Sequence, residues 1–168
     1  MYRLCWLLLV LPTLATAAER GDLLDLLRAT GKGPTCAQFV AVGDTAYRDL
    51  FGIAHDGAMD ASIRGRAVSF LSCFPTAPVQ HWLAAEVTGG EIPLVRSKAC
   101  SALATAFPDD AAAAIVPALS DAKVDVRTAA AKALGGLSDP AADKALRARL
   151  NREPNARVKD AIREALRR

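Results

Sequence analysis

The residues that could carry chemistry in this chain are few, and they stand apart from one another. There are two histidines: His55 lies in a predicted turn beside Asp56, and His81 lies in a predicted helix just before Trp82. A zinc site or a hydrolytic site needs converging histidine, cysteine or carboxylate groups, such as two histidines spaced i, i+4 on one helix. Neither histidine has such a neighbour, and no glycine-rich phosphate loop is present. We therefore expect no catalytic residues, no metal site and no cofactor.

A regular series of cations is the stronger signal, and it runs in phase with apolar residues. The cations Arg64, Arg96, Arg127 and Lys159 follow one another at intervals of 31 or 32 residues. The residue before each cation and those three and seven positions after it are apolar: Ile63, Ala67 and Leu71; Val95, Ala99 and Leu103; Val126, Ala130 and Leu134; Val158, Ile162 and Leu166. Apolar residues at i, i+4 and i+8 form one face of a helix. A period of this length indicates stacked units, none of which buries its apolar face alone.

Residues 115–137 carry the clearest unit, which resembles a HEAT repeat, an antiparallel helix pair. The resemblance rests on Pro117, Ala118 and Leu119 closing one helix, Asp121 in the turn, Val126 and Arg127 opening the next helix, and Ala129, Ala130, Ala133, Leu134 and Gly135 within it. It extends over residues 35–168, and the short period is similar to that of bacterial HEAT-like and phycobilisome lyase-type repeats. The resemblance implies an all-α fold, a right-handed α-solenoid. We expect repeats at about 35–74, 76–107, 109–137 and 139–168, preceded by a capping helix at about 20–30.

The resemblance also implies a role for the cationic series. In HEAT-like proteins the equivalent arginine is commonly structural, and it bonds an acidic side chain or a carbonyl group in the turn before it. Acidic residues stand there in this chain: Asp60 ahead of Arg64, Glu91 ahead of Arg96, and Asp121 and Asp125 ahead of Arg127. We therefore interpret Arg64, Arg96, Arg127 and Lys159 as scaffold rather than as a basic binding stripe. Asp109 and Asp110 are interpreted as helix-capping residues.

The first 17 residues have the composition of a signal peptide. Arg3 precedes an apolar run from residue 4 to residue 11, and the small residues Ala15 and Ala17 fit an A-x-A cleavage pattern. We expect cleavage before Ala18, and the alternative is an uncleaved anchor. Export, together with an alanine-rich composition that favours arginine over lysine, predicts a bacterial periplasmic or extracellular protein with no membrane span in the mature chain.

Three cysteines remain after that cleavage, in a compartment that favours disulfides. Cys36 opens the first helix of a predicted antiparallel pair and Cys73 closes the second, so a short turn between the helices brings these two ends together. We predict a Cys36–Cys73 disulfide. Cys100 falls in a different predicted helix, where we expect it to be buried as a small hydrophobic residue.

The second helices, which in HEAT-like solenoids line the inner side, present small residues on the surface where a partner would bind. The predicted partner groove comprises Ser69, Lys98, Ser101, Thr128 and Lys132. No aromatic anchors stand there, so a protein partner would bring its own and bind with moderate affinity. The turns at 88–93 and 120–125 are the next candidates.

Charge gives little support for other partners. The net charge is only +3. The basic residues of 147–168 alternate with acids. Single-strand nucleic-acid binding would require aromatic residues among them, and there are none. We predict a monomeric, exported scaffold or protein–protein interaction module without catalysis. The alternative is a lyase-type or other ligand-modifying enzyme, or a chaperone, built on HEAT-like repeats.

Overall fold

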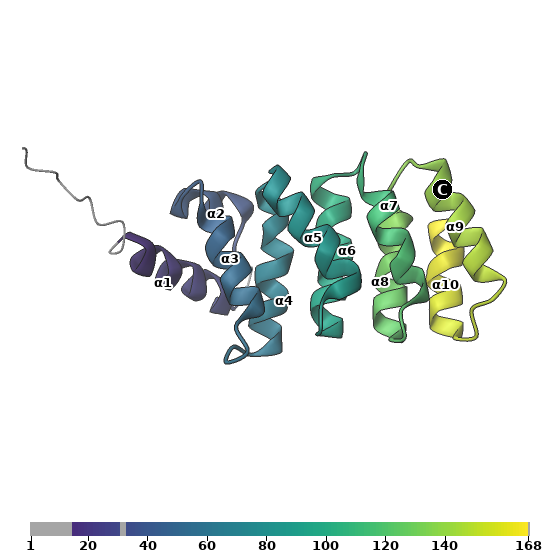
Figure 1. Cartoon of the computed structure of the whole chain (residues 1–168), viewed down its shortest axis with the longest axis horizontal. Helices are drawn as coiled ribbons and strands as arrows, with labels where there is room; N and C mark the ends of the chain where they lie inside the picture. Colours follow the sequence, from purple (N-terminus) through teal and green to yellow (C-terminus); the bar gives the residue numbers. More distant parts are fainter. Residues whose placement is uncertain (1–14, 31–32, 168) are drawn as a thin grey trace, which may run out of the picture.

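A computed structural model of the chain describes residues 15–30 and 33–167, and its secondary structure there is helical (Figure 1). The elements are α1 (Ala15–Arg28), α2 (Cys36–Val42), α3 (Ala46–His55), α4 (Ala61–Phe70), η1 (Leu71–Cys73), α5 (Ala77–Gly89), α6 (Pro93–Ala106), α7 (Ala111–Ile115), η2 (Val116–Ser120), α8 (Val124–Leu134), α9 (Pro140–Leu150) and α10 (Ala156–Ala165). The all-α prediction is confirmed. Most of the predicted signal peptide, residues 1–14, lies outside the described residues, while its last three residues form the first turn of α1.

The helices form an elongated stack of pairs, from α1 at one end to α9 and α10 at the other (Figure 1). The second helices of the pairs, α4, α6, α8 and α10, pack side by side in one row. The first helices α5, α7 and α9 adjoin one another in a second row. This arrangement is an α-solenoid, in which each unit completes its core only by packing against its neighbours.

The core consists of the residues that recur in phase along the sequence. Val95, Val126 and Val158 start the buried faces of α6, α8 and α10 and are at most 2% exposed. The residues four positions later, Ala67, Ala99, Ala130 and Ile162, are completely buried. Small side chains on these faces let adjacent helices approach closely, while the leucines of α6 and α8 fill the space that remains. The sequence periodicity therefore maps directly onto the packing of the second-helix row.

The N-terminal unit differs from the single long helix that the apolar pattern of residues 36–54 predicts. The first helix ends at Gly43, the C-cap of α2, and a second helix, α3, begins at Ala46. A glycine inside a helix costs about 1 kcal/mol relative to alanine. Three residues near the break, Gly43, Asp44 and Thr45, favour turns and caps over helix interior. That prediction of one continuous helix was wrong, and two shorter helices pack there instead.

Helix α1 closes the N-terminal end of the stack by packing against α2, α3 and α4. Its residues Leu23 and Leu27 are completely buried. Two arginines hold it in place: Arg20 pairs with Asp56 at 3.1 Å, and Arg66 of α4 donates to the Ala29 carbonyl at 3.0 Å. At the other end of the stack, Asp139 caps α9, since its carboxylate accepts from the backbone N–H of Ala141 at 2.6 Å.

A disulfide joins Cys36 and Cys73, whose Cα atoms are 5.2 Å apart, and it closes the N-terminal unit. The separation lies within the range that a disulfide requires. The sulfur of Cys100, by contrast, is completely buried in α6. No helix among the described residues is both long enough and apolar enough to cross a membrane.

Candidate functional site

Two arginines of the cationic series join one repeat to the next through ion pairs. Arg96 of α6 donates from Nε and Nη2 to both carboxylate oxygens of Asp121, at 2.7 and 3.1 Å. Arg127 of α8 makes the same two-point contact with Glu153, at 2.9 Å for each hydrogen bond. A planar guanidinium matches a carboxylate in this geometry, and such charge-assisted pairs are the strong ones. We call these two contacts the inter-repeat ion pairs.

The remaining nitrogen of each arginine binds the turn that precedes its own helix. Nη1 of Arg96 donates to the Gly90 carbonyl at 2.8 Å, and Nη1 of Arg127 donates to the Asp121 carbonyl at 2.9 Å. The predicted bond to the preceding turn is therefore present, but it is made to carbonyl groups. Of the two predicted alternatives, the carbonyl group is correct and the acidic side chain is wrong: the side chains of Glu91, Asp121 and Asp125 do not bond the arginine that follows them. The carboxylates come from the next unit of the stack, 25 and 26 residues further along, and each arginine contacts that unit and its own turn at the same time.

Burial and hydrogen bonding set the charge state of the two carboxylates. Burial alone would raise the pKa of Glu153, but hydrogen bonds from Arg127, from the Asn155 backbone N–H and from Arg149 lower it to about 2. The pKa of Asp121 is also lowered: the bonds from Arg96 and from the Lys123 backbone N–H outweigh the effect of burial. Both groups are therefore ionised at neutral pH and hold the repeats together as charged pairs.

The two ends of the cationic series lack such a pair. At the C-terminal end, the side chain of Lys159 makes no hydrogen bond to a residue that the structure describes. At the other end, Arg64 of α4 donates from Nε to the Ala54 carbonyl at 2.6 Å. Within residues 15–30 and 33–167, its two terminal nitrogens have no hydrogen-bonding partner. The preceding acid, Asp60, is not bonded to Arg64 through its side chain, so that predicted contact was also wrong.

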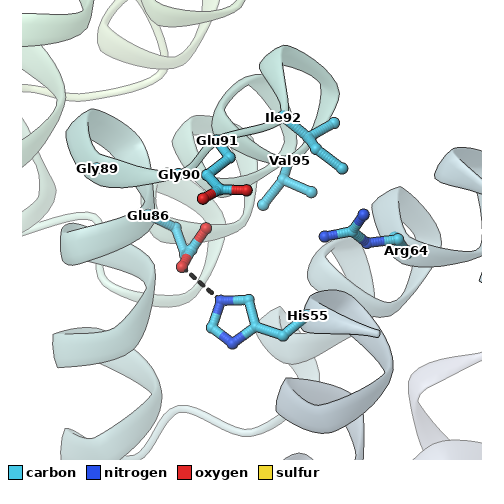
Figure 2. Close-up of a pocket in the computed structure, with 8 residues that line it drawn as sticks. All are labelled: His55, Arg64, Glu86, Gly89, Gly90, Glu91, Ile92 and Val95. Carbon is cyan, nitrogen blue, oxygen red and sulfur yellow. Dashed lines mark hydrogen bonds and ion pairs between the residues drawn. The ribbon is translucent and has the colours of Figure 1, made fainter. Parts of the chain in front are cut away.

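An open pocket of about 300 Å³ lies beside Arg64, between α3, α4 and the turn from α5 to α6 (Figure 2). It is lined by His55, Arg64, Glu86, Gly89, Gly90, Glu91, Ile92 and Val95. Figure 2 shows the guanidinium of Arg64 on one side and Glu86 on the other, with Ile92 and Val95 between them. This pocket thus brings ionisable groups from α3, α4, α5 and the turn after α5 around the apolar side chains of Ile92 and Val95.

His55 and Glu86 form the closest side-chain contact in this pocket. Nε2 of His55 lies 2.8 Å from Oε1 of Glu86, and the histidine is 57% exposed while Glu86 is 13% exposed (Figure 2). A histidine–carboxylate pair can orient a general base, and a triad adds a hydroxyl or thiol within reach of the histidine. The lining of this pocket contains no serine, threonine or cysteine. The His55–Glu86 pair is therefore not part of a triad with a residue of this lining.

The predicted partner groove is divided by the structure into exposed and buried members. Ser101 and Lys132 are exposed, and Ser69 and Lys98 are half-buried on the same row of second helices. Thr128 is only 9% exposed, and its hydroxyl donates to the Val124 carbonyl at 2.8 Å. Its placement in the groove was wrong, because α6 and α10 pack against the two flanks of α8, the helix that carries Thr128.

The remaining histidine, tryptophan and aspartate candidates lie outside the pocket beside Arg64. Trp82 stacks on Phe51 with ring centroids 5.0 Å apart. His81 is exposed on α5. Asp110 precedes α7 without capping it, and its carboxylate accepts from Gln80 at 3.4 Å instead. The described part of the chain contains no group of three or more histidine, cysteine and acidic side chains arranged to hold a metal ion.

Four basic residues of the C-terminal region are paired with acidic residues within the protein. Arg149 binds Glu153, Arg157 binds Asp125, and two further exposed pairs join Arg163 to Asp160 and Arg167 to Glu164. This mixture of paired charges matches a solvated face on a terminal repeat.

Comparison with known families gives one match to this architecture. A family model for HEAT repeats matches residues 81–167, which run from within α5 to beyond the end of α10 and include both inter-repeat ion pairs. Curated proteins provide no significant match to the chain.

Proposed function

The chain belongs to the family of HEAT repeats, and from that premise we propose that it is a non-catalytic scaffold that binds another protein or a peptide. We call the exposed side of α4, α6, α8 and α10 the second-helix face, and we place the partner there. The observation that carries the proposal is the continuity of this face: four second helices from successive units lie side by side in one row. Such rows give solenoids an extended surface for another chain.

The composition of the second-helix face favours a protein partner of moderate affinity. Its exposed residues include Ser101 and Lys132, and Lys98 lies half-buried at its rim. Among the described residues, the large hydrophobic side chains that stand exposed are Val40 and Leu94, at 42% and 37%. Without aromatic anchors of its own, this face offers few points of concentrated binding energy, so the partner would supply them. Because the solenoid has only a few repeats, the contact area with a partner is small. We therefore propose a monomeric scaffold that forms a transient complex.

We further propose that the protein acts outside the cytoplasm, in the periplasm or extracellular space of a bacterium. The support is the apolar run and A-x-A pattern of residues 1–17, together with the Cys36–Cys73 disulfide. Disulfides persist in oxidising compartments and are rare in the cytosol.

A pair of double variants tests the placement of the partner. Ser101→Arg with Lys132→Glu changes two exposed side chains of the second-helix face without touching the core. The matched control is His81→Arg with Lys144→Glu, which makes changes of similar size at exposed positions of the first helices α5 and α9. We expect the first double variant to lose a partner captured from the cell envelope and the control to retain it, with equal helicity by circular dichroism. Retention by both variants would move the interface away from the second-helix face.

A further inference from the structure

The inter-repeat ion pairs follow a register that can be extended to the next unit. Asp121 and Gly90 occupy equivalent positions at the ends of η2 and α5. Their backbone angles are nearly the same, φ −58° and ψ 146° for Asp121 and φ −61° and ψ 130° for Gly90. The carbonyl of each accepts from Nη1 of the arginine six residues later. Since Asp121 supplies the carboxylate for Arg96, the equivalent carboxylate for Arg64 would stand at position 90, where this chain has glycine.

The chain cannot supply that carboxylate at position 90 without rearrangement. The backbone angles of Gly90 suit any residue, so conformation is not the obstacle. A Cβ atom at this position would lie 2.8 Å from the Glu86 carbonyl oxygen and 2.6 Å from the Glu86 side chain. Such a contact with backbone forces the end of α5 to shift. The place that Asp121 fills for Arg96 is thus left open to solvent beside Arg64, and it forms part of the pocket in Figure 2.

Arg64 has hydrogen-bonding capacity that this pocket leaves unused. Its Nε is committed to the Ala54 carbonyl, whereas the Nε atoms of Arg96 and Arg127 are bonded to carboxylates. Nη1 and Nη2 of Arg64 have no partner within residues 15–30 and 33–167, and Figure 2 shows the guanidinium at the edge of the pocket. Two terminal N–H groups side by side form a fork that a single carboxylate can accept in a two-point contact.

We propose that the pocket beside Arg64 binds a carboxylate of the partner protein, which takes the place that Asp121 and Glu153 take in the two inter-repeat ion pairs. The proposal rests on the proposed function, and it names the chemistry by which this scaffold would recognise its partner. The carboxylate accepts from Nη1 and Nη2 of Arg64, and the adjacent chain of the partner lies over Ile92 and Val95.

The opposite wall sets a second requirement on the partner. Glu86 keeps one oxygen on His55 and has its other oxygen beside Gly90, while Glu91 is exposed at the rim. Two carboxylates there disfavour a ligand that carries only negative charge. A peptide segment meets the requirement, because backbone N–H groups flank its carboxylate and can donate to Glu86. The binding energy of the isolated contact is small, so we expect dissociation constants near the millimolar range for short peptides.

Three capped tripeptides test the proposal by NMR titration of the full-length protein. Acetyl-Gly-Glu-Gly-amide carries a side-chain carboxylate, acetyl-Gly-Gly-Gly carries a C-terminal carboxylate, and acetyl-Gly-Gln-Gly-amide is the uncharged control. We expect saturable shifts of the Ile92 and Val95 methyl signals and of the Arg64 Nε–H signal with a carboxylate peptide, and none with the glutamine peptide. A response to only one carboxylate peptide identifies the source and supports the proposal. Equal responses to the glutamate and glutamine peptides, or no response to any peptide, overturn it.

Two variants add a control on position and on charge. Arg64→Gln removes the fork, and we expect it to abolish the shifts. Lys144→Gln removes the same charge from exposed α9, outside the second-helix face, and we expect it to leave them unchanged. A loss of shifts in both variants would mean that net charge alone is responsible, which contradicts the proposal. The comparison of glutamate and glutamine peptides needs no variant, so it decides the matter even if Arg64→Gln fails to fold.

Failure of this inference can be told from failure of the proposed function. A protein partner that is lost with the Ser101 and Lys132 double variant but retained by Arg64→Gln keeps the scaffold function and overturns the carboxylate site. Peptide carboxylates that bind at Arg64 in a protein without any partner on the second-helix face support the site and overturn the placement of the interface.

Discussion

The ion pair between Arg127 and Glu153 gives the sharpest prediction about stability, and the change that tests it is Glu153→Gln. The Glu153 carboxylate is completely buried and binds two arginines, Arg127 at 2.9 Å and Arg149 at 2.5 Å. Glutamine keeps the shape of the side chain but removes its charge, so both guanidinium groups lose their anionic partner. Arg127 is itself only 8% exposed, and a charge left buried in this way is costly.

The expected loss can be worked from the pKa of Glu153. A fall from 4.5 to about 2 corresponds to roughly 3 kcal/mol at neutral pH. Truncation of one partner of a buried pair costs about 3–5 kcal/mol, which agrees with that figure. Because the folded-state pKa is lowered, this stabilisation is fully present above pH 4.5 and is lost as the pH falls towards 2. The difference between the wild type and Glu153→Gln should therefore shrink to about 1–2 kcal/mol at pH 3.

Urea unfolding followed by circular dichroism at pH 7 and pH 3 measures both quantities. The matched control is Glu164→Gln in the same terminal unit, where the pair with Arg167 is 76% and 73% exposed. Exposed pairs contribute at most about 1 kcal/mol, so the control should change little at either pH. A loss in Glu153→Gln that is no larger than in Glu164→Gln, or that stays constant between pH 7 and pH 3, would refute the reasoning.

Three further predictions concern the thiols, the helix packing and the N-terminus. Replacing Cys36 and Cys73 by serine should lower the free energy of unfolding by about 2–4 kcal/mol. In the native protein Cys100 should resist alkylation, because burial raises its pKa to about 12. Rapid alkylation of Cys100 in the native protein would contradict its burial. Gly65→Leu should destabilise by about 1–3 kcal/mol because its Cβ would lie 3.0 Å from Leu94, whereas Gly21→Leu, with open space around it, should not; equal urea midpoints would count against the packing described. Intact mass of the exported protein should begin at Ala18 or within a residue or two, and a full-length mass would show instead that the leader is retained.

The sequence was sufficient for the solenoid because its packing is local and periodic. The positions equivalent to Val126, Ala130 and Leu134 recur in phase and are buried in the inner units, while Ile63 and Leu166 at the two ends of the series are partly buried. The break at Gly43 was not predicted, since the apolar pattern continues across it and the penalty for glycine in a helix is small. The Cys36–Cys73 pairing could be predicted all the same, because it depends on where the ends of the unit meet and little on the path between them.

The partners of the cationic series could be predicted only in part. Bonds to the preceding carbonyl groups follow from sequence proximity, but Asp121 and Glu153 lie 25 and 26 residues beyond the arginines they bind. The open place beside Arg64 becomes visible only when that register is known, since a glycine at position 90 is otherwise an ordinary turn residue. The burial of Thr128 likewise depends on how α6, α8 and α10 pack, which a pattern along one helix does not contain.

The most direct test of a protein-binding second-helix face is site-specific photo-crosslinking in the producing cells. A photoreactive amino acid at Ser101 places the crosslinker on exposed α6, and the same residue at His81 places it on the exposed side of α5. We expect a discrete crosslinked protein from position 101 that is absent from position 81 and is lost with Lys132→Glu. Crosslinks from position 81 alone, or none to any protein from position 101, would contradict the assignment of this surface to a partner.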